Sequence, residues 1–465
     1  HYAPARRFTP NFWRDRFQAH RIIEEVKATR IKPEHATDAS GVGAAGRAPR
    51  PPRKTLRDEA TQCIALFKRA FLSKLRNRWN LTTTLLEAPL LAILISSVLR
   101  YSEDGGYTYL SAFHLPTYIF MNLVCGMFFG LTNSSDDIIR DRVILQRERN
   151  HRPRLTYYIL AKLLSLGLFA AIQCAIYLVI GNALLEVRGM FMLHFAWMFL
   201  TTMTGVITGM AISAIVRDGK TAFNFVPVVL VPQIILGGSL IKYEEMNRNL
   251  DLAYTMRQWV KKDAEGNPMQ DPSKLSVPFI CEFMPLRWSY EGAILSQQRL
   301  NPWARNLELL QNDIDRYTEI NRTGDLTDEQ GEALDNAKIV RALVYGLEAR
   351  SPEAVDRLMS AIMTDYRNGT FNNDNYDISS SDDNVTAEGL YENKKILLLT
   401  DQAEAERTDI TSQGAPPNVF FGHRKRFFGV EVSTLWLDFV VLISLGIGGL
   451  TILFFTLKRK LTRVK

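Results

Sequence analysis

Six apolar runs, each about 20 residues long, divide this chain of 465 residues. Helices of this length cross about 30 Å of hydrocarbon, because each helical residue advances about 1.5 Å. In lipid, a helix also satisfies its own backbone hydrogen bonds. The pattern therefore predicts an all-α polytopic membrane protein with six transmembrane helices. The runs are residues 81–99, 115–132, 163–185, 191–216, 222–241 and 437–457.

A strongly charged stretch, residues 140–162, joins the second run to the third. It cannot lie in hydrocarbon, where each charge costs several kcal/mol. Its excess of arginine predicts the cytoplasmic side, because short loops rich in Lys and Arg stay inside. A helical reading puts Val143, Ile144 and Arg147 on one side of a short surface helix. Such a helix is suited to contacting another protein.

Charge is distributed unevenly along the chain. Residues 242–420 contain 19 basic and 31 acidic residues, whereas the whole chain carries a net charge of +7. A cytoplasmic N-terminus and six spans place this acidic segment outside. The same arrangement leaves three basic segments inside, which fits the positive-inside rule: residues 140–162, 217–220 and 458–465. We expect a multi-pass protein of the inner (plasma) membrane with both termini in the cytoplasm.

The predicted organisation has five parts. Residues 1–54 form a cytoplasmic linker, and residues 55–79 form a basic amphipathic helix on the inner membrane surface. Residues 80–241 contain spans one to five. Residues 242–432 form a mostly helical extracytoplasmic domain, and residues 433–465 contain span six with a basic tail. Within the outer domain, the aromatic residues of 278–298 are expected at headgroup depth of the outer interface.

Ionisable residues are scarce in the runs. Glu87 lies well inside one, while His194 and Asp438 lie near the starts of two others, and none has an obvious partner of opposite charge. A carrier coupled to ions usually places several such groups along its path. A carrier or channel driven by an ion gradient, dependent on Glu87, therefore stays a secondary hypothesis. A membrane anchor for a periplasmic interaction domain is another.

Several segments together resemble the membrane domain of the G-type ABC transporters, also called type V exporters. They are the basic helix 55–79, the six runs, the inner loop with RER before a Tyr and LAK, and the aromatic segment WSYEGAILSQ. The resemblance covers residues 55–298 and 433–461. The outer segment is longer than in that family and lacks paired cysteines, which favours a bacterial relative.

The resemblance implies roles for individual residues. Helix 55–79 would be the connecting helix, and residues 136–152 the coupling helix that docks on the ATPase domain, through Asp141, Arg142, Arg147, Glu148 and Arg149. Two copies would pair around a substrate slit lined by spans two and five, with an outer gate at Leu240 and Ile241. The residues facing the slit would be Asn122, Cys125, Phe128, Phe129, Leu230, Gln233 and Ile234.

The leading hypothesis is the permease part of an ATP-driven exporter for an amphipathic or lipid-like substrate. We expect no catalytic residue, metal or cofactor in this chain, because ATP and Mg would bind the ATPase domain. That domain would be fused upstream or be a separate chain. The other expected partners are a second permease copy, membrane lipids and a periplasmic partner of residues 242–432, and no nucleic acid is expected.

Overall fold

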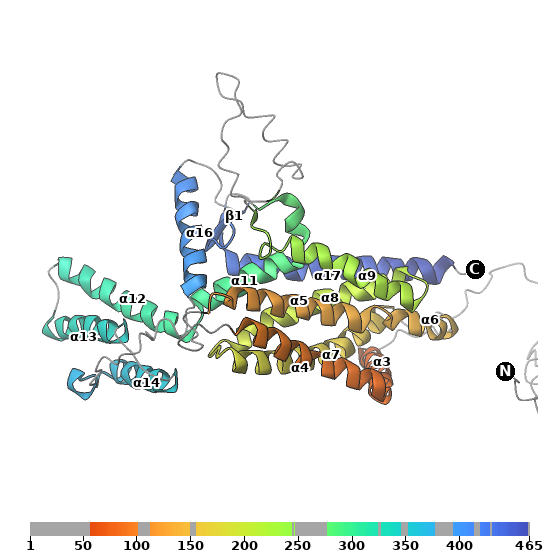
Figure 1. Cartoon of the computed structure of the whole chain (residues 1–465), viewed down its shortest axis with the longest axis horizontal. Coiled ribbons are helices and arrows are strands. Elements are labelled where there is room, and N and C mark those ends of the chain that lie inside the picture. The colour runs from red at the N-terminus through yellow and green to blue at the C-terminus, as the bar shows by residue number, and fades with distance from the viewer. Residues whose placement is uncertain are drawn as a thin grey trace, which may run out of the picture. The chain divides into compact units, whose positions relative to one another are not determined.

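The computed structural model describes the chain in ten segments, which are residues 56–100, 112–148, 155–243, 246, 277–323, 327–345, 352–376, 394–412, 419–427 and 430–463. These residues are mostly helical, and long helices run side by side in a bundle (Figure 1). The predicted all-α polytopic fold is confirmed. The predicted linker 1–54, Arg149 and the side chains of Arg147 and Glu148 lie outside what is described.

Five helical segments among the described residues are long and apolar enough to cross a membrane. The second of them continues from α5 into α6 (Asp137–Glu148), which follows α5 after a two-residue turn. The helices that contain these segments are α4 (Arg78–Leu99), α5 (Leu115–Ser134), α7 (Leu155–Leu184), α8 (Phe191–Ile215) and α17 (Thr434–Arg463).

The predicted fifth span, residues 222–241, is shorter in the structure. Helix α9 (Gly219–Ile235) has 17 residues and ends six residues before the expected boundary. Gly238 has a φ of +84°, in the left-handed region that favours glycine. A Cβ on Gly237 would lie 2.7 Å from the Phe120 ring, so this position also needs a glycine. The two glycines end the helix and turn the chain against α5.

Helix α7 begins at Leu155, eight residues before the apolar run that predicted it. Lys162, which we expected in an aqueous loop, is therefore a buried residue of this helix. The prediction failed because it counted the lysine as an unpaired charge. The structure provides it with two carboxylates from α6.

Helix α3 (Leu56–Arg76) corresponds to the predicted amphipathic helix and is separated from α4 by Asn77. Phe71 stacks on Phe169 of α7, with ring centroids 5.5 Å apart. Other apolar side chains of α3, such as Ile64 and Leu72, are exposed. They suit a helix that lies on a membrane surface, which stays a prediction.

The closest helix pair in the bundle is α5 with α8, which meet at small residues. A Cβ on Gly126 would lie 2.7 Å from the Thr202 hydroxyl, and one on Gly205 would lie 2.7 Å from the Met127 carbonyl oxygen. Glycine therefore permits backbone contact across this interface, as is common between membrane helices.

Most of residues 278–298 are buried inside the protein, whereas we predicted that their aromatic side chains lie at the outer interface; Phe279 and Phe283 are exposed. The segment forms the 3₁₀ helix η5 (Phe279–Phe283) and helix α11 (Pro285–Arg299), and every residue from 285 to 297 is buried. Helix α11 packs against α5, α8 and α17. Two of its hydroxyl groups find partners on α8, because Trp197 donates to the Ser296 hydroxyl at 2.8 Å and the Thr201 and Ser289 hydroxyls are 2.6 Å apart. Because these hydrogen bonds satisfy polar side chains of α11, a segment whose mixed aromatic and polar composition is typical of a membrane interface can lie in the core.

The long insertion between α9 and α17, which we predicted to lie outside the membrane, contains two kinds of helix beyond α11. Three helices form a unit with its own apolar core, which includes Trp303, Leu310, Val340 and Ile362: α12 (Pro302–Thr323), α13 (Asp328–Tyr345) and α14 (Pro352–Asn368). Helix α16 (Lys394–Ser412) instead packs on α11 and α5. The short 3₁₀ helix η6 (Asn373–Asn375) follows α14.

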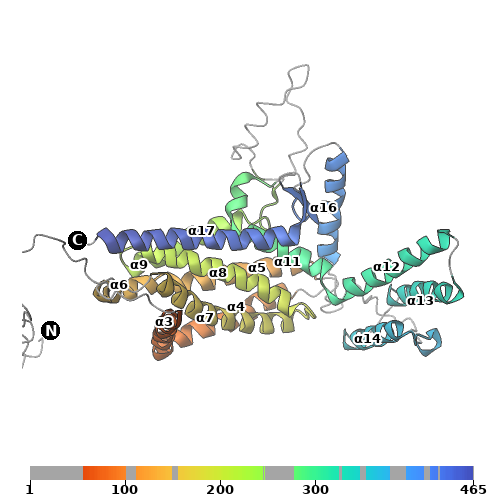
Figure 2. The same cartoon turned by 180° about the vertical axis from the view of Figure 1, so that it is seen from behind.

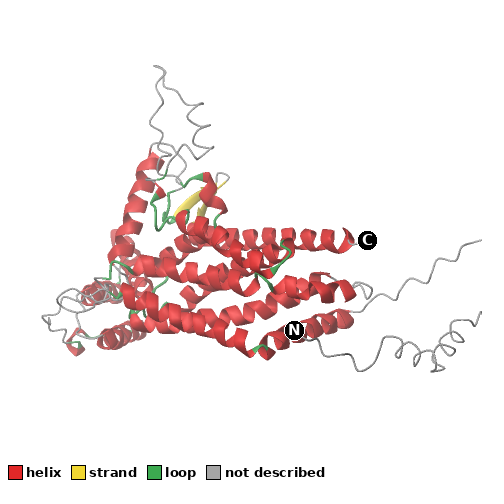
Figure 3. Cartoon of the chain, turned by 45° about the vertical axis from the view of Figure 1, so that its right-hand side comes forward, coloured by secondary structure: helices red, strands yellow, loops and turns green. Residues whose placement is uncertain are grey.

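A two-stranded antiparallel hairpin precedes α17, which the prediction of a mostly helical insertion did not include (Figure 3). Strand β1 (Arg424–Phe427) pairs with β2 (Val430–Ser433), with Arg424 opposite Ser433. Lys425 of β1 is buried toward α11. The hairpin therefore connects the outer insertion to the last long apolar helix.

Candidate functional site

Helix α6 is anchored to the end of α8 through its backbone and one arginine. The Ser213 hydroxyl accepts hydrogen bonds from the N–H groups of Ile138 and Ile139, at 3.0 and 3.1 Å. These are among the first N–H groups of α6, which no residue of their own helix can satisfy. Arg142 donates to the Val216 carbonyl oxygen at 2.6 Å. A cation at a helix C-terminus also interacts favourably with the helix dipole.

A lysine of α7 fixes the opposite side of α6. The Lys162 ammonium lies 2.8 Å from a carboxylate oxygen of Asp137 and 2.8 Å from one of Asp141. The Tyr158 hydroxyl donates to the same Asp141 oxygen at 3.1 Å. Asp137 and Lys162 are both less than a tenth exposed. Sequence reasoning missed Lys162, although its place four residues after the last aromatic of TYYILAK was visible.

The five predicted coupling residues divide into two groups. Asp141 and Arg142 make the contacts described above. Asp141 pairs with Lys162 of α7, and Arg142 donates to the Val216 carbonyl oxygen at the end of α8. The exposed side of α6 carries Arg140, Val143 and Ile144. The other three predicted residues fall outside the described side chains, so their docking role stays a prediction: Arg147, Glu148 and Arg149.

Helix α3 is connected to three long helices by a chain of hydrogen bonds. The Lys74 ammonium donates to the Asn133 carbonyl oxygen at 3.1 Å, and burial lowers the pKa of Lys74. The Asn133 amide donates to the Gln173 side chain at 2.6 Å, which in turn donates to the Thr84 carbonyl oxygen at 2.7 Å. Gln173 thus connects α7 to α4 and α5, as polar side chains commonly do between membrane helices.

The predicted slit residues do not all share one surface of this chain. Helices α5 and α9 are in contact, as the prediction required. Phe128, Leu230 and Ile234 are partly exposed where these two helices meet. The remaining four are buried within the bundle: Asn122, Cys125, Phe129 and Gln233. Gln233 has a specific contact, because its side-chain oxygen accepts the N–H of Leu286 in α11 at 3.3 Å.

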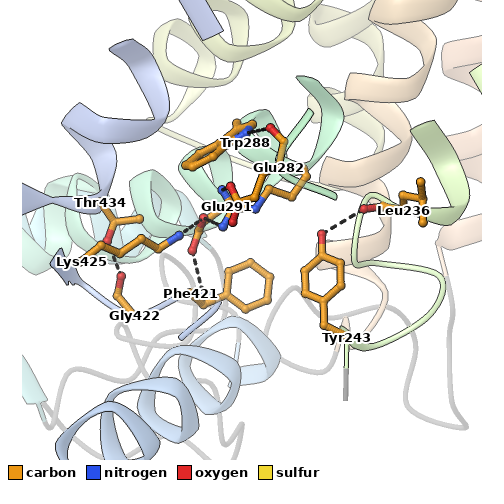
Figure 4. Close-up of polar contacts among 10 residues, drawn as sticks. Leu236, Tyr243, Glu282, Trp288, Glu291, Phe421, Gly422, Lys425 and Thr434 are labelled. Atoms are coloured by element: carbon orange, nitrogen blue, oxygen red, sulfur yellow. Dashed lines mark hydrogen bonds and ion pairs between the residues drawn. The ribbon is translucent and has the colours of Figure 1, made fainter. Parts of the chain in front are cut away.

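The predicted outer gate lies in the turn that follows α9. Leu240 is 66% exposed and Ile241 is half-buried. Two residues further on, the Tyr243 hydroxyl donates to the Leu236 carbonyl oxygen at 3.1 Å (Figure 4). The Tyr243 ring meets the Phe420 ring edge to face, with centroids 4.7 Å apart.

A cluster of buried charges near this turn was not predicted. The Glu291 carboxylate lies 2.5 Å from the Lys425 ammonium and 3.3 Å from the Arg287 guanidinium. Asp438, which we expected to lack a partner of opposite charge, is buried beside these cations. The i and i+4 spacing of Arg287 and Glu291 in RWSYE was the available signal.

Burial affects the two cations of this cluster differently. Burial lowers the pKa of Lys425, the neighbouring Arg287 lowers it further, and Glu291 only partly opposes these effects. Burial alone would also lower the pKa of Arg287, but the carboxylates of Glu291 and Glu282 outweigh it and raise that pKa. Arg287 is therefore the permanent positive charge of the cluster.

The comparison with protein families agrees with this architecture. Residues 61–256 match the family model of the ABC-2 type transporter. That range begins in α3 and includes α4 to α9. A search of characterised proteins found no significant match. The match bears out the resemblance to ABC transporter permeases. With its long apolar helices, the chain is a multi-pass membrane protein, and its residues 61–256 are similar to the membrane (permease) domain of ABC-2 type transporters.

Proposed function

We propose that the chain is the permease part of an ATP-driven exporter, which moves an amphipathic or lipid-like substrate outward by alternating access in a dimer. Permeases of this type work with an ABC ATPase and are typically dimeric. The observation that carries the proposal is the attachment of α6. This helix continues from α5 and is fixed to α7 by Lys162 and to α8 by Ser213.

This attachment supports transmission of force. An ATPase that grips the exposed side of α6 would displace α5, α7 and α8 together, because buried ion pairs and hydrogen bonds connect them. Helix α9 packs on α5 and would respond to the same displacement. Movement of α5 against α9 of the second copy would then change access to the slit between the copies.

The arrangement of the bundle supports docking of the ATPase at one end. Figure 2 shows α3, α6 and the C-terminal end of α17 at one end of the bundle, while α11 and α16 lie at the other. The first end carries the basic segments that we assign to the cytoplasm of an inner-membrane protein. The ATPase, with its ATP and Mg, would dock there, and the outer insertion would face the periplasm.

The surface of α9 supports an apolar or amphipathic substrate. Phe223, Phe225, Val228 and Val231 are exposed on this helix, and Phe128 of α5 is partly exposed next to it. A lipid tail or another apolar group would be compatible with such a wall. Gln233 is the polar residue of α9 that is buried against α11 rather than offered to a substrate.

The test uses the full-length protein with its ATPase in proteoliposomes, and a fluorescent phospholipid as the transported probe. Ile144→Asp places a charge on the exposed side of α6, and we expect it to abolish ATP-driven transport without lowering the melting temperature. Glu148→Ala and Arg147→Ala should weaken the coupling of ATP hydrolysis to transport. Arg299→Ala, an exposed change at the end of α11, is the matched control.

Two outcomes would contradict the proposal. Unchanged transport in all three α6 variants would remove α6 from the coupling role. Transport that persists without ATP and is lost in Glu87→Gln would instead support a carrier driven by an ion gradient.

A further inference from the structure

The turn that contains Leu240 and Ile241 depends on one aromatic residue. The Tyr243 hydroxyl closes the turn on the Leu236 carbonyl oxygen, as described above. A Cβ on Gly238 would lie 2.6 Å from the Tyr243 ring, so the backbone itself touches this ring. Tyr243 is buried although Leu240 is not. The turn is therefore built around Tyr243.

Tyr243 in turn depends on the position of Phe420. Their rings pack edge to face, and Phe420 also contacts the Tyr290 ring of α11, with centroids 6.2 Å apart. The Arg287 guanidinium stacks 3.6 Å from the Trp288 ring centroid and lies 5.8 Å from that of Phe420. Phe420 thus fills the space between α11 and the turn after α9.

A single carboxylate fixes the segment that carries Phe420. One oxygen of Glu291 accepts the N–H of Phe421 at 2.9 Å, and the other accepts the Lys425 ammonium at 2.5 Å (Figure 4). Arg287, one helical turn earlier, contributes the third contact. Glu291 and Arg287 are at most 1% exposed. Charged hydrogen bonds are strong in such a dry environment, and losing one leaves its partners unsatisfied.

We propose that Glu291 is the positioning residue of the outer gate, and that it acts through Phe420 and Tyr243. It connects α11, the chain before β1 and the hairpin, and so holds Phe420 against the turn that follows α9. The gate opens when Phe420 and Tyr243 separate. The proposal rests on the proposed function only in calling Leu240 and Ile241, within the turn 236–243, the outer gate.

Hydrogen–deuterium exchange of the full-length protein in lipid nanodiscs tests this connection. We expect Glu291→Gln to make the amides of residues 236–243 exchange about tenfold faster, as loss of a charged hydrogen bond predicts. The matched control is Glu282→Gln. Glu282 also faces Arg287, at 3.5 Å, but its side chain is a third exposed and lies on η5. This control should leave residues 236–243 unchanged.

A second variant separates positioning from general stability. Phe420→Leu removes the ring contact and leaves the ion pairs in place, so it should accelerate exchange at 236–243 but not in α11. Unchanged protection in α5 and α8, the helix pair at the centre of the bundle, shows that each variant is folded. If Glu291→Gln does not fold, Phe420→Leu alone decides the question.

Two results would overturn the inference. One is normal exchange at 236–243 in Phe420→Leu. The other is a folded Glu291→Gln whose exchange changes only in α11 and residues 419–427. Failure of the exporter proposal would appear in the transport assay and would not alter the exchange pattern, so the two proposals can fail separately.

Discussion

Lys162 and Asp137 form a buried ion pair 2.8 Å long, although the lysine belongs to a helix apolar enough to cross a membrane. The pair joins α7 to the first turn of α6, and Asp141 extends it one turn further. Through this contact, α6 holds a long apolar helix at a fixed distance.

Lys162→Met should destabilise the protein by about 3–5 kcal/mol, because it leaves the buried Asp137 and the partly buried Asp141 without their cation. The melting temperature in detergent, followed by tryptophan fluorescence, measures this loss. The triple variant Lys162→Met, Asp137→Asn, Asp141→Asn should recover most of it, since no unpaired charge remains. Leu164→Met, an exposed change on the same helix, is the control. A melting temperature for Lys162→Met equal to that of the parent would contradict this assignment.

Gly130→Ala should separate α5 from α8. A Cβ at this position would lie 2.7 Å from the backbone nitrogen of Val206, and a backbone atom cannot move aside as a side chain can. We expect a loss of about 1–3 kcal/mol of stability, the usual cost of overpacking. Gly448→Ala is the matched control, because no atom lies within 4 Å of the added methyl group. The prediction fails if both variants melt at the same temperature.

Glu282 should make stability depend on pH in the mildly acidic range. Burial raises the pKa of Glu282 above its ordinary value of 4.5, although Arg287 opposes the effect. Between 4.5 and the raised value, the folded protein binds more protons than the unfolded chain, so this group adds stability as pH falls. The melting temperature of the parent should therefore rise relative to that of Glu282→Gln between pH 7 and about pH 5. If the difference in melting temperature between the parent and Glu282→Gln stays constant or shrinks as the pH falls, the pKa of Glu282 is not raised.

The apolar runs predicted most of the long helices because hydrocarbon thickness fixes a minimum length and leaves few alternative structures. The same logic failed at single residues. Lys162 looked like a residue of an aqueous loop, since a sequence cannot show that α6 supplies its counter-charges. The end of α9 was missed because Gly237 and Gly238 lie within the apolar run 222–241, whereas they turn the chain.

The outer region was harder to predict for a related reason. The aromatic segment around Trp288 resembles an interfacial sequence, but its polar groups pair with α8, the chain before β1 and the hairpin, which are distant in sequence. Glu291 meets Lys425 across 134 residues. No local pattern marks such a contact. The candidate site was accordingly predicted at the level of helices, and its individual contacts required the structure.

The separate core of α12 to α14 has a practical consequence. Helix α16 packs on α11, and the apolar core of the bundle contains no side chain of α12, α13 or α14 among the described residues. Residues between α11 and α16 therefore form a site for grafting a fluorescent reporter. Insertions within α16 would instead disturb the packing of Ile396 and Thr400, whose side chains are fully buried near the start of this helix.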